Sequence, residues 1–155
     1  MLEVRQKAPA NYSGFVDDTI YLDHIQREKA RLKVTSVKGE EVRLFLERGQ
    51  ILQRDEILVS ACKRFIQVKL AGEPVITAST DSWQDFSRAC YHLGNRHVRL
   101  QIGELWLRFL PDPVLLELVQ HLGLSAEQHQ AEFAPESGAY GHGHAGKAAH
   151  HADSH

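Results

Sequence analysis

Short runs of alternating apolar and polar residues follow one another through the first half of the chain. They occupy residues 32–37, 42–47 and 65–70, a further short apolar run occupies residues 57–60, and glycine or other turn-forming residues lie between the runs. Alternation with a period of two is typical of strands that bury one face, and glycine-bounded pairs of runs are typical of hairpins. No helical spacing is evident here. The pattern predicts an all-β domain over residues 1–72, built as a small sandwich or an open barrel.

The pattern changes after residues 71–74, where glycine and proline occur together. Because these residues punctuate a chain, we place a domain boundary here. A short strand is expected at residues 75–78. The helix that follows is expected to begin with Ser82 and Asp85 as a capping box and to stop at Gly94-Asn95. Its apolar stripe consists of Trp83, Phe86, Cys90 and Leu93.

Two strands and a second helix come next. Residues 98–102 and 105–109 are expected to pair around Gly103-Glu104, with glycine in the first position of a type II′ turn. Asp112 can cap the second helix, which has a proline directly after the cap and Gly123 near its end. The expected buried stripe of this helix is Val114, Leu115, Leu118 and Leu122.

A last strand around residues 131–133 gives the order strand, helix, strand, strand, helix, strand. This order is that of the split βαβ unit of a ferredoxin-like domain, which we predict over residues 75–137. The predicted fold class is therefore α+β, with an all-β domain followed by a ferredoxin-like domain.

The last segment of the chain, from residue 138 onward, is rich in histidine. The chain of 155 residues holds 10 histidines, and apolar periodicity disappears from residue 138 onward. We expect residues 138–155 to form a disordered tail, since nothing in them offsets the entropy of ordering a backbone. Five histidines occur in this tail: His142, His144, His150, His151 and His155.

Histidine-rich tracts favour metal binding, because neutral imidazole suits nickel, copper and zinc. Flexible glycine and alanine spacers let several rings turn toward one ion. Two other interpretations remain for the tail, an expression tag or an inert solvated segment. A tag is usually an unbroken histidine run, and this tract is interrupted by other residues. The sequence does not separate Ni²⁺ from Zn²⁺ or Cu²⁺ as the ion.

His97 is the remaining candidate ligand, because it follows directly after the expected end of the first helix. A histidine there can be explained by the helix dipole alone. If the domain forms a two-fold dimer, however, a residue on the axis faces its own copy, and two imidazoles can then share one ion. Among the other candidates, Cys90 is expected to be a buried thiol and Cys62 an inert residue at a strand edge. We expect His24, His92 and His121 to be surface residues.

No enzyme signature is present, because the sequence contains no Ser/His/Asp triad order, no glycine-rich phosphate-binding loop, no His-Glu-x-x-His motif and no paired-cysteine motif. The formal charge of −2 gives no field that would draw the protein onto nucleic acid. No apolar run is long enough for a membrane helix, and no secretory signal is visible at the N-terminus. The expectation is a non-enzymatic cytoplasmic protein that binds neither nucleic acid nor membrane.

One stretch carries a more specific signal. Residues 90–97 read Cys-Tyr-His-Leu-Gly-Asn-Arg-His, and Leu-Gln-Ile follows at 100–102. Together with Asp112-x-Val-Leu, with Phe133-x-Pro-Glu-x-Gly-Ala-Tyr and with the histidine-rich end, this stretch resembles the urease accessory protein E family. Leu-Phe-Leu-x-Arg-Gly at 44–49 resembles the family as well, so the resemblance covers nearly the whole chain.

The resemblance implies a nickel metallochaperone of urease maturation. It implies an N-terminal domain that binds peptide and a homodimer joined through the C-terminal domains, with His97 at the interface. It also implies delivery of Ni²⁺ to a complex of the urease apoprotein and its accessory proteins, including a GTPase. Some family members carry further histidines before the second helix, where this chain reads Leu110-Pro111-Asp112. A metal site at that point is therefore not expected, and Arg54-Asp55 replaces a more usual Gly-Asp.

Three functions follow as hypotheses. The first is a homodimeric nickel carrier in which His97 of each subunit and the tail histidines hold the ion. The second is a peptide-binding module without metal delivery, in which the β domain does the work. The third is metal storage or detoxification by the tail alone.

Overall fold

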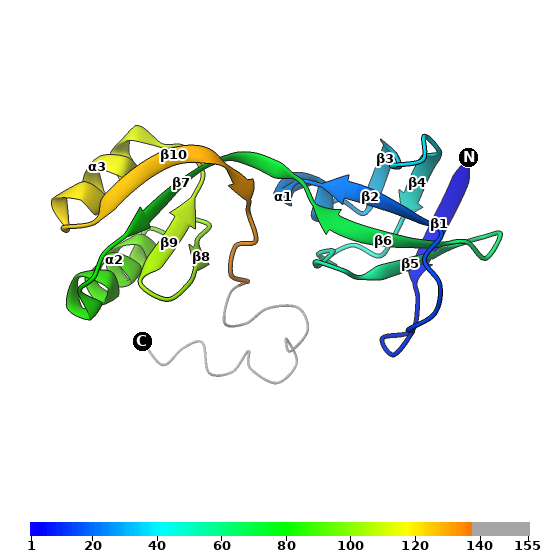
Figure 1. Ribbon diagram of the computed structural model, residues 1–155, viewed down its shortest axis with the longest axis horizontal. Helices are drawn as coiled ribbons and strands as arrows, with labels where there is room; N and C mark the ends of the chain where they lie inside the picture. The colour runs from blue at the N-terminus through cyan, green and yellow to red at the C-terminus, as the bar shows by residue number, and fades with distance from the viewer. Residues whose placement is uncertain (138–155) are drawn as a thin grey trace. The chain divides into compact units, whose positions relative to one another are not determined.

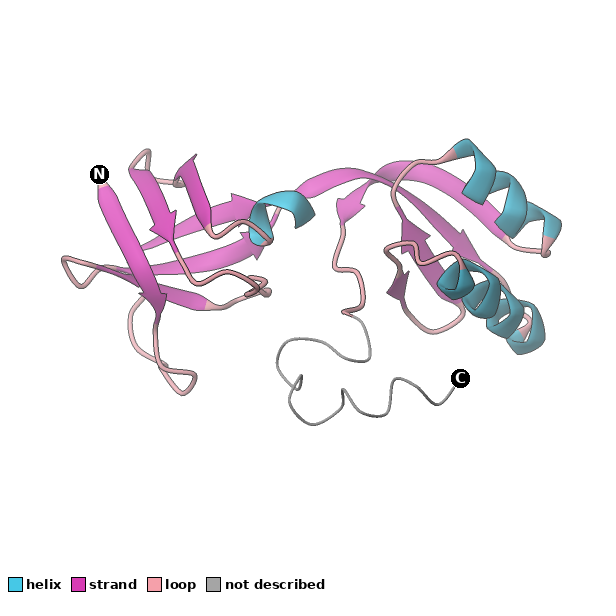
Figure 2. Cartoon of the chain, turned by 180° about the vertical axis from the view of Figure 1, so that it is seen from behind, coloured by secondary structure: helices cyan, strands magenta, loops and turns pink. Residues whose placement is uncertain are grey.

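The computed structural model describes residues 1–137 and shows a two-domain α+β protein made mostly of strands (Figures 1 and 2). The chain divides into two compact units, the first of which is Met1–Ala71, while the second begins at Gly72. The expected tail, residues 138–155, lies outside the described residues.

The N-terminal domain is strand-rich. Its elements are β1 (Leu2–Lys7), β2 (Asp18–Leu22), α1 (His24–Arg27), β3 (Arg31–Thr35), β4 (Glu41–Phe45), β5 (Ile57–Ser60) and β6 (Phe65–Leu70). The four strands expected from the alternating runs are thus confirmed as β3 to β6. Two further strands, β1 and β2, were not predicted from the sequence.

One six-stranded sheet, in the order β2-β6-β5-β1-β4-β3, contains all the strands of this domain. The pairs β1–β4 and β2–β6 are parallel, whereas the remaining neighbours are antiparallel. The sheet's two edges meet at one point, where the Val37 amide donates to the Thr19 carbonyl at 2.9 Å. This contact favours the open barrel over the sandwich. Alternate positions such as Val4, Val42 and Leu44 fill its interior and are fully buried.

No helix was expected before residue 72, but the structure contains one helical turn there. Helix α1 is four residues long and begins with a complete capping box between Asp23 and Gln26. The Asp23 carboxylate accepts from the Gln26 amide at 2.8 Å, and the Gln26 side chain accepts from the Asp23 amide at 2.9 Å. A single turn gives too few apolar positions to show a helical period, so only its cap carried a signal.

The C-terminal domain contains four strands and two helices. Its elements are β7 (Gly72–Ser79), α2 (Trp83–Asn95), β8 (Gln101–Ile102), β9 (Trp106–Phe109), α3 (Pro113–His121) and β10 (Ser125–Glu132). The strands pair only antiparallel, in the order β10-β7-β9-β8. Strand β7 begins before the expected residue 75 and includes Pro74, which lies where β9 does not pair with β7.

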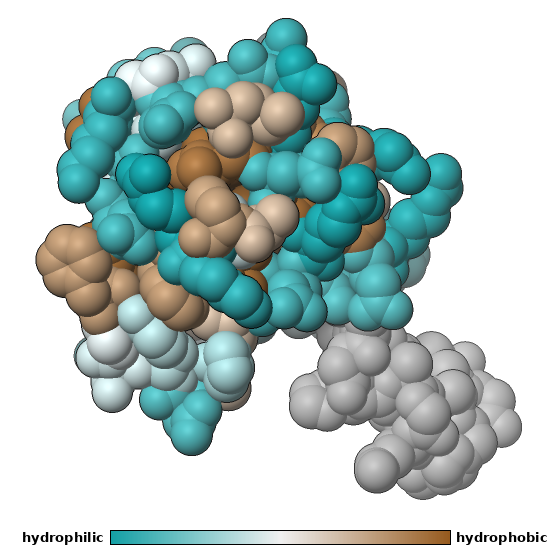
Figure 3. All heavy atoms as spheres, turned by 90° about the vertical axis from the view of Figure 1, so that its right-hand side faces the viewer, coloured by the Kyte–Doolittle hydropathy of each residue, from teal (hydrophilic) through white to brown (hydrophobic). Residues whose placement is uncertain are grey.

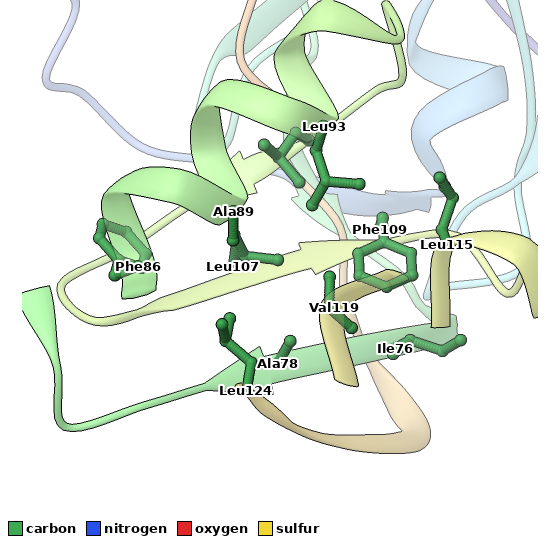
Figure 4. Packing of buried hydrophobic residues seen from close by; sticks show 11 residues of the cluster. Ile76, Ala78, Phe86, Ala89, Leu93, Leu107, Phe109, Leu115, Val119 and Leu124 are labelled. Carbon is green, nitrogen blue, oxygen red and sulfur yellow. The ribbon is translucent and has the colours of Figure 1, made fainter. Parts of the chain in front are cut away.

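Both helices pack on the same face of this sheet (Figure 4). The core consists of Phe86, Ala89 and Leu93 from α2, Leu115 and Val119 from α3, and Ile76, Ala78, Leu100, Leu107, Phe109 and Leu124 from the strands and loops. The expected stripes are therefore partly wrong. Trp83 and Val114 are each 57% exposed, while Ala89 and Val119 are fully buried.

The start of α2 and the following hairpin differ from expectation in detail. The Ser82 hydroxyl caps the helix by accepting from the Asp85 amide at 3.1 Å, but the Ser82 amide donates to Thr80 Oγ1, so the capping box is not closed. In the turn between β8 and β9 the positive φ falls on Leu105 (64°) and not on Gly103, so the turn is not type II′.

Helix α3 follows its sequence signals closely. Asp112 accepts from the amides of Val114 and Leu115, at 2.8 and 3.2 Å, and Pro113 occupies the first turn. Gly123 follows the C-cap with a φ of 99°, a conformation that favours glycine. The last strand, β10, is confirmed but begins at Ser125, six residues before the expected start.

Candidate functional site

His97 lies just beyond the C-terminal end of α2, where its side chain is exposed. Its φ is 59°, in the left-handed region that non-glycine residues rarely adopt. The His97 amide donates to the Gly94 carbonyl at 3.0 Å, and the amide of the C-cap residue Arg96 donates to Leu93 at 3.1 Å. The backbone of the last turn thus fixes where His97 leaves the helix.

This geometry corrects the expected helix stop. Gly94 and Asn95 belong to α2, so the helix runs through the pair that was expected to end it. The left-handed position that usually falls to glycine is occupied by His97 instead. Left-handed backbone costs a non-glycine residue about 1–2 kcal/mol, which the packing of Leu93 in the core offsets.

A small hollow lies directly after His97 in the chain. Its volume is about 230 Å³, and it is lined by Val98, Arg99, Phe109, Leu110, Pro111, Asp112 and Leu115. Asp112 is the acidic residue of this lining, and its carboxylate already accepts two amides as the cap of α3. Both amides donate to the same carboxylate oxygen, Oδ1, so Asp112 fixes the start of α3 at the rim of this hollow. The expectation of no metal site at residues 110–112 stays a prediction.

Within residues 1–137, no three histidine, cysteine or acidic side chains come together in a cluster that could hold a metal ion. His97 accordingly belongs to no cluster of three such side chains in the part of the chain that is described. The other candidate ligands, His142, His144, His150, His151 and His155, lie outside the described residues.

The remaining histidines of the described part fall into two groups. His92 and His121 are exposed, as expected. His24 was expected at the surface but is only 6% exposed, because it opens the one-turn helix α1. No sequence pattern distinguishes a buried histidine such as His24, directly after the N-cap residue Asp23, from an exposed one.

His129 was not singled out from the sequence, yet it takes part in a polar network. Its Nε2 lies 2.7 Å from the Thr77 hydroxyl, which also accepts from Arg108 Nε at 2.8 Å. Arg108 donates further to the Glu132 carbonyl at 2.8 Å and lies over the Trp106 ring. Burial lowers the pKa of the Arg108 guanidinium below its ordinary value. A permanent cation next to His129 disfavours a metal ion there.

The two cysteines differ in environment. Cys90 is partly buried against the core of the C-terminal domain, and burial raises the pKa of its thiol, which matches the expected inert residue. Cys62 is exposed in the turn between β5 and β6, where its sulfur lies 3.3 Å from the Ser60 hydroxyl.

The sequence was compared with known protein families and curated proteins. The family described as UreE urease accessory protein matches with both of its domains, the N-terminal one over residues 3–71 and the C-terminal one over residues 73–155. A urease accessory protein UreE of Marinomonas sp. (strain MWYL1) is 48% identical over 144 residues, which cover 93% of this chain and 98% of the relative. One of Alteromonas mediterranea is 55% identical over 128 residues, or 83% of each chain.

The class defined by these matches is that of two-domain accessory proteins of urease. The chain belongs to the UreE urease accessory protein family, and the resemblance noted in the sequence is confirmed. Membership supports a role as a chaperone in urease maturation. In the described part of the chain, no helix has the length and apolar character needed to cross a membrane.

Proposed function

We propose that this protein is a nickel metallochaperone that delivers Ni²⁺ to the urease apoprotein and its accessory proteins, including the accessory GTPase. In this role it is a cytoplasmic carrier and not an enzyme. The ligands are His97 and the tail histidines His142, His144, His150, His151 and His155. The observation that carries the proposal is the exposed imidazole of His97, which the last turn of α2 holds in a left-handed backbone conformation.

The proposed carrier is a homodimer joined through the C-terminal domain. Two His97 side chains on a two-fold axis give two nitrogens to one ion, and tail histidines complete the coordination. We assign this domain to the ferredoxin-like class. The element order of β7 to β10 with α2 and α3, and the antiparallel order β10-β7-β9-β8, support this assignment.

The chemistry of such a site suits a carrier. Imidazole must be neutral to bind, so affinity falls as the pH drops through about 6.5. A site shared between two chains loses part of its binding energy to ordering its ligands, which favours release. Zn²⁺ and Cu²⁺ use the same ligands and are therefore expected to compete with nickel.

Calorimetric titration of the full-length protein with Ni²⁺ tests the proposal. The variant His97→Ala is expected to lose the tightest site, whereas truncation after Tyr140 lowers the number of ions bound. His92→Ala, which removes an exposed histidine of helix α2, is the matched control and is expected to bind like the wild type. Tight binding that survives in His97→Ala contradicts the assignment.

Transfer of bound nickel to urease apoprotein in a defined mixture distinguishes delivery from storage. A carrier activates urease in the presence of the accessory proteins, while a storage protein retains the ion. Deletion of residues 1–71 tests the peptide-binding alternative: loss of partner binding with nickel binding intact favours a module whose working part is the β domain.

A further inference from the structure

The N-terminal domain contains a hollow between two segments of its chain, which we call the basic hollow. Its volume is about 420 Å³, and its lining consists of Glu28, Lys29, Ala30, Arg31, Arg48 and Gly49. One segment runs from the end of helix α1 into strand β3, while the other follows strand β4. The volume lies within the range of small-molecule sites, which is roughly 300–1,000 Å³.

Two backbone hydrogen bonds tie these segments together. The Leu46 amide donates to the Ala30 carbonyl at 2.7 Å, and the Leu52 amide donates to the Arg27 carbonyl at 2.9 Å. Leu52 is itself buried in the core of the domain. At the turn between them Gly49 has a φ of 85°, and a Cβ there would meet no atom within 4 Å. The backbone therefore holds the basic hollow in shape and leaves the side of Gly49 open.

Three side chains of this lining are cations, in a chain whose formal charge is −2. Lys29, Arg31 and Arg48 are exposed, and none of them forms an ion pair within residues 1–137. The carboxylate of the lining, Glu28, already has an interaction partner within the protein. The basic hollow is therefore a local concentration of positive charge.

The neighbouring charged residues interact with one another and do not line the hollow. Arg43 donates to the Glu41 carboxylate, and Arg43 and Lys33 together favour a lowered pKa of that carboxyl. Glu47 accepts from the side-chain amide of Gln50 at 3.1 Å. In Figure 3, which looks at the N-terminal domain, hydrophilic residues cover most of the visible face. A polar ligand thus suits the surface of this domain.

Arg31 is positioned at the hollow by an aromatic ring. It lies opposite Phe45 in the β3–β4 pair, and its guanidinium carbon is 5.5 Å from the centroid of that ring. A guanidinium over a ring keeps its edge N–H groups able to donate, and its planar fork matches two oxygens of a phosphate. Arg48 offers a second guanidinium and Lys29 an ammonium group, so a short chain of phosphates can be contacted at three points.

We propose that the basic hollow binds a compact oligophosphate anion, either free or as the phosphate chain of a nucleotide, through Lys29, Arg31 and Arg48. Three cations around one hollow match a ligand that carries several negative charges on a short chain, whereas a single carboxylate would engage only one of them. The inference concerns the N-terminal domain and does not rest on the proposed nickel handling.

Isothermal titration calorimetry of the full-length, metal-free protein with inorganic tripolyphosphate tests this inference. A pH of about 8 keeps histidine side chains neutral, so they do not attract the anion. We expect binding that weakens with added salt. The double variant Lys29→Gln/Arg48→Gln is expected to bind about tenfold more weakly, because it loses two charge contacts with the ligand. Arg31→Lys keeps the charge without the planar fork and is expected to lose less than the double variant.

The matched control is Lys63→Gln/Arg88→Gln, which removes the same charge at two exposed cations outside the lining. It is expected to bind like the wild type. An equal loss in the control, or unchanged binding in Lys29→Gln/Arg48→Gln, overturns the proposal. So does equal affinity for citrate, which carries three carboxylates and no phosphate.

Adenosine triphosphate distinguishes the two sources of the phosphate chain, since it has as many phosphates as tripolyphosphate. Tighter binding of the nucleotide supports the proposal with a nucleotide as the ligand, because the base and the sugar then add contacts. Equal or weaker binding supports it with the free oligophosphate as the ligand. Absence of binding of both anions at millimolar concentration overturns it.

Discussion

The left-handed backbone of His97 allows ligand chemistry and stability to be tested with one pair of variants. Both His97→Gly and His97→Ala remove the imidazole, but only glycine adopts a φ of 59° without a steric cost. We therefore expect the glycine variant to be the more stable of the two. The usual order inside a helix, where alanine is better than glycine by about 1 kcal/mol, is reversed at this position.

The magnitude follows from the backbone. A Cβ in the left-handed region costs about 1–2 kcal/mol. For a domain of this size, 1 kcal/mol corresponds to a shift of roughly 4–8 °C in the melting temperature. The glycine variant is thus expected to melt several degrees above the alanine variant when both are free of metal.

Thermal unfolding followed by circular dichroism, in the presence of a chelator, measures this difference. His92 provides the control, because it lies inside α2 and is exposed, so His92→Gly is expected to be less stable than His92→Ala by about 1 kcal/mol. If His97→Gly melts at or below His97→Ala while the His92 pair behaves as expected, the strained conformation of His97 is refuted.

Two further predictions concern stability. Asp18 is 4% exposed, and although burial raises the pKa of its carboxyl, hydrogen bonds from Ser36 and nearby amides outweigh it and hold the pKa below its ordinary value. The stabilisation is therefore complete above about pH 4 and disappears as the pH falls through the lowered pKa. Asp18→Asn should cost about 1–3 kcal/mol in urea titrations at neutral pH and progressively less as the solution is acidified. A Cβ at Gly103 would collide with the Trp106 indole, so Gly103→Ala in a Trp83→Phe background should shift the tryptophan emission maximum, and an unchanged spectrum would contradict this packing.

Much of the strand content could be predicted because each strand that was found buries one face. The runs that became β3, β4 and β6 alternate, as burial of one sheet face requires, whereas β5 is a continuous apolar run. Strand β1 alternates only over Leu2 and Val4 before polar residues take over, so its pattern is too short to stand out. It is nevertheless central in the sheet, and pairing with β4 and β5 overrides its weak local signal.

The buried faces of the helices were harder to predict. In α3, apolar residues occupy most positions, so the sequence alone does not determine which of Val114 and Val119 faces the sheet. The packing of both helices on one sheet decides it. At the end of α2, Gly94 was expected to stop the helix, and this prediction was wrong. Leu93 packs in the core and the helix continues through Asn95, so the left-handed residue is His97.

The candidate site was only partly visible from the sequence. The pattern around His97 by itself favoured a structural histidine at a helix end, and the prediction of a ligand there came from the resemblance to a family. His129 gave no signal because its partners, Thr77 and Arg108, come from strands distant in the sequence.

The pairing of β7 with β10 sets the order in which the chain can fold during synthesis. All eight residues of β7 pair with β10, from Gly72 with Glu132 to Ser79 with Ser125. All strands of the N-terminal sheet have been synthesised once residue 70 has left the ribosome. Strand β7, in contrast, is followed by about 50 residues before β10, which covers its edge, has been synthesised. Until then β7 exposes unpaired backbone, and such an edge can pair with another nascent chain. Translational pausing after β10 should therefore favour correct folding more than pausing before it.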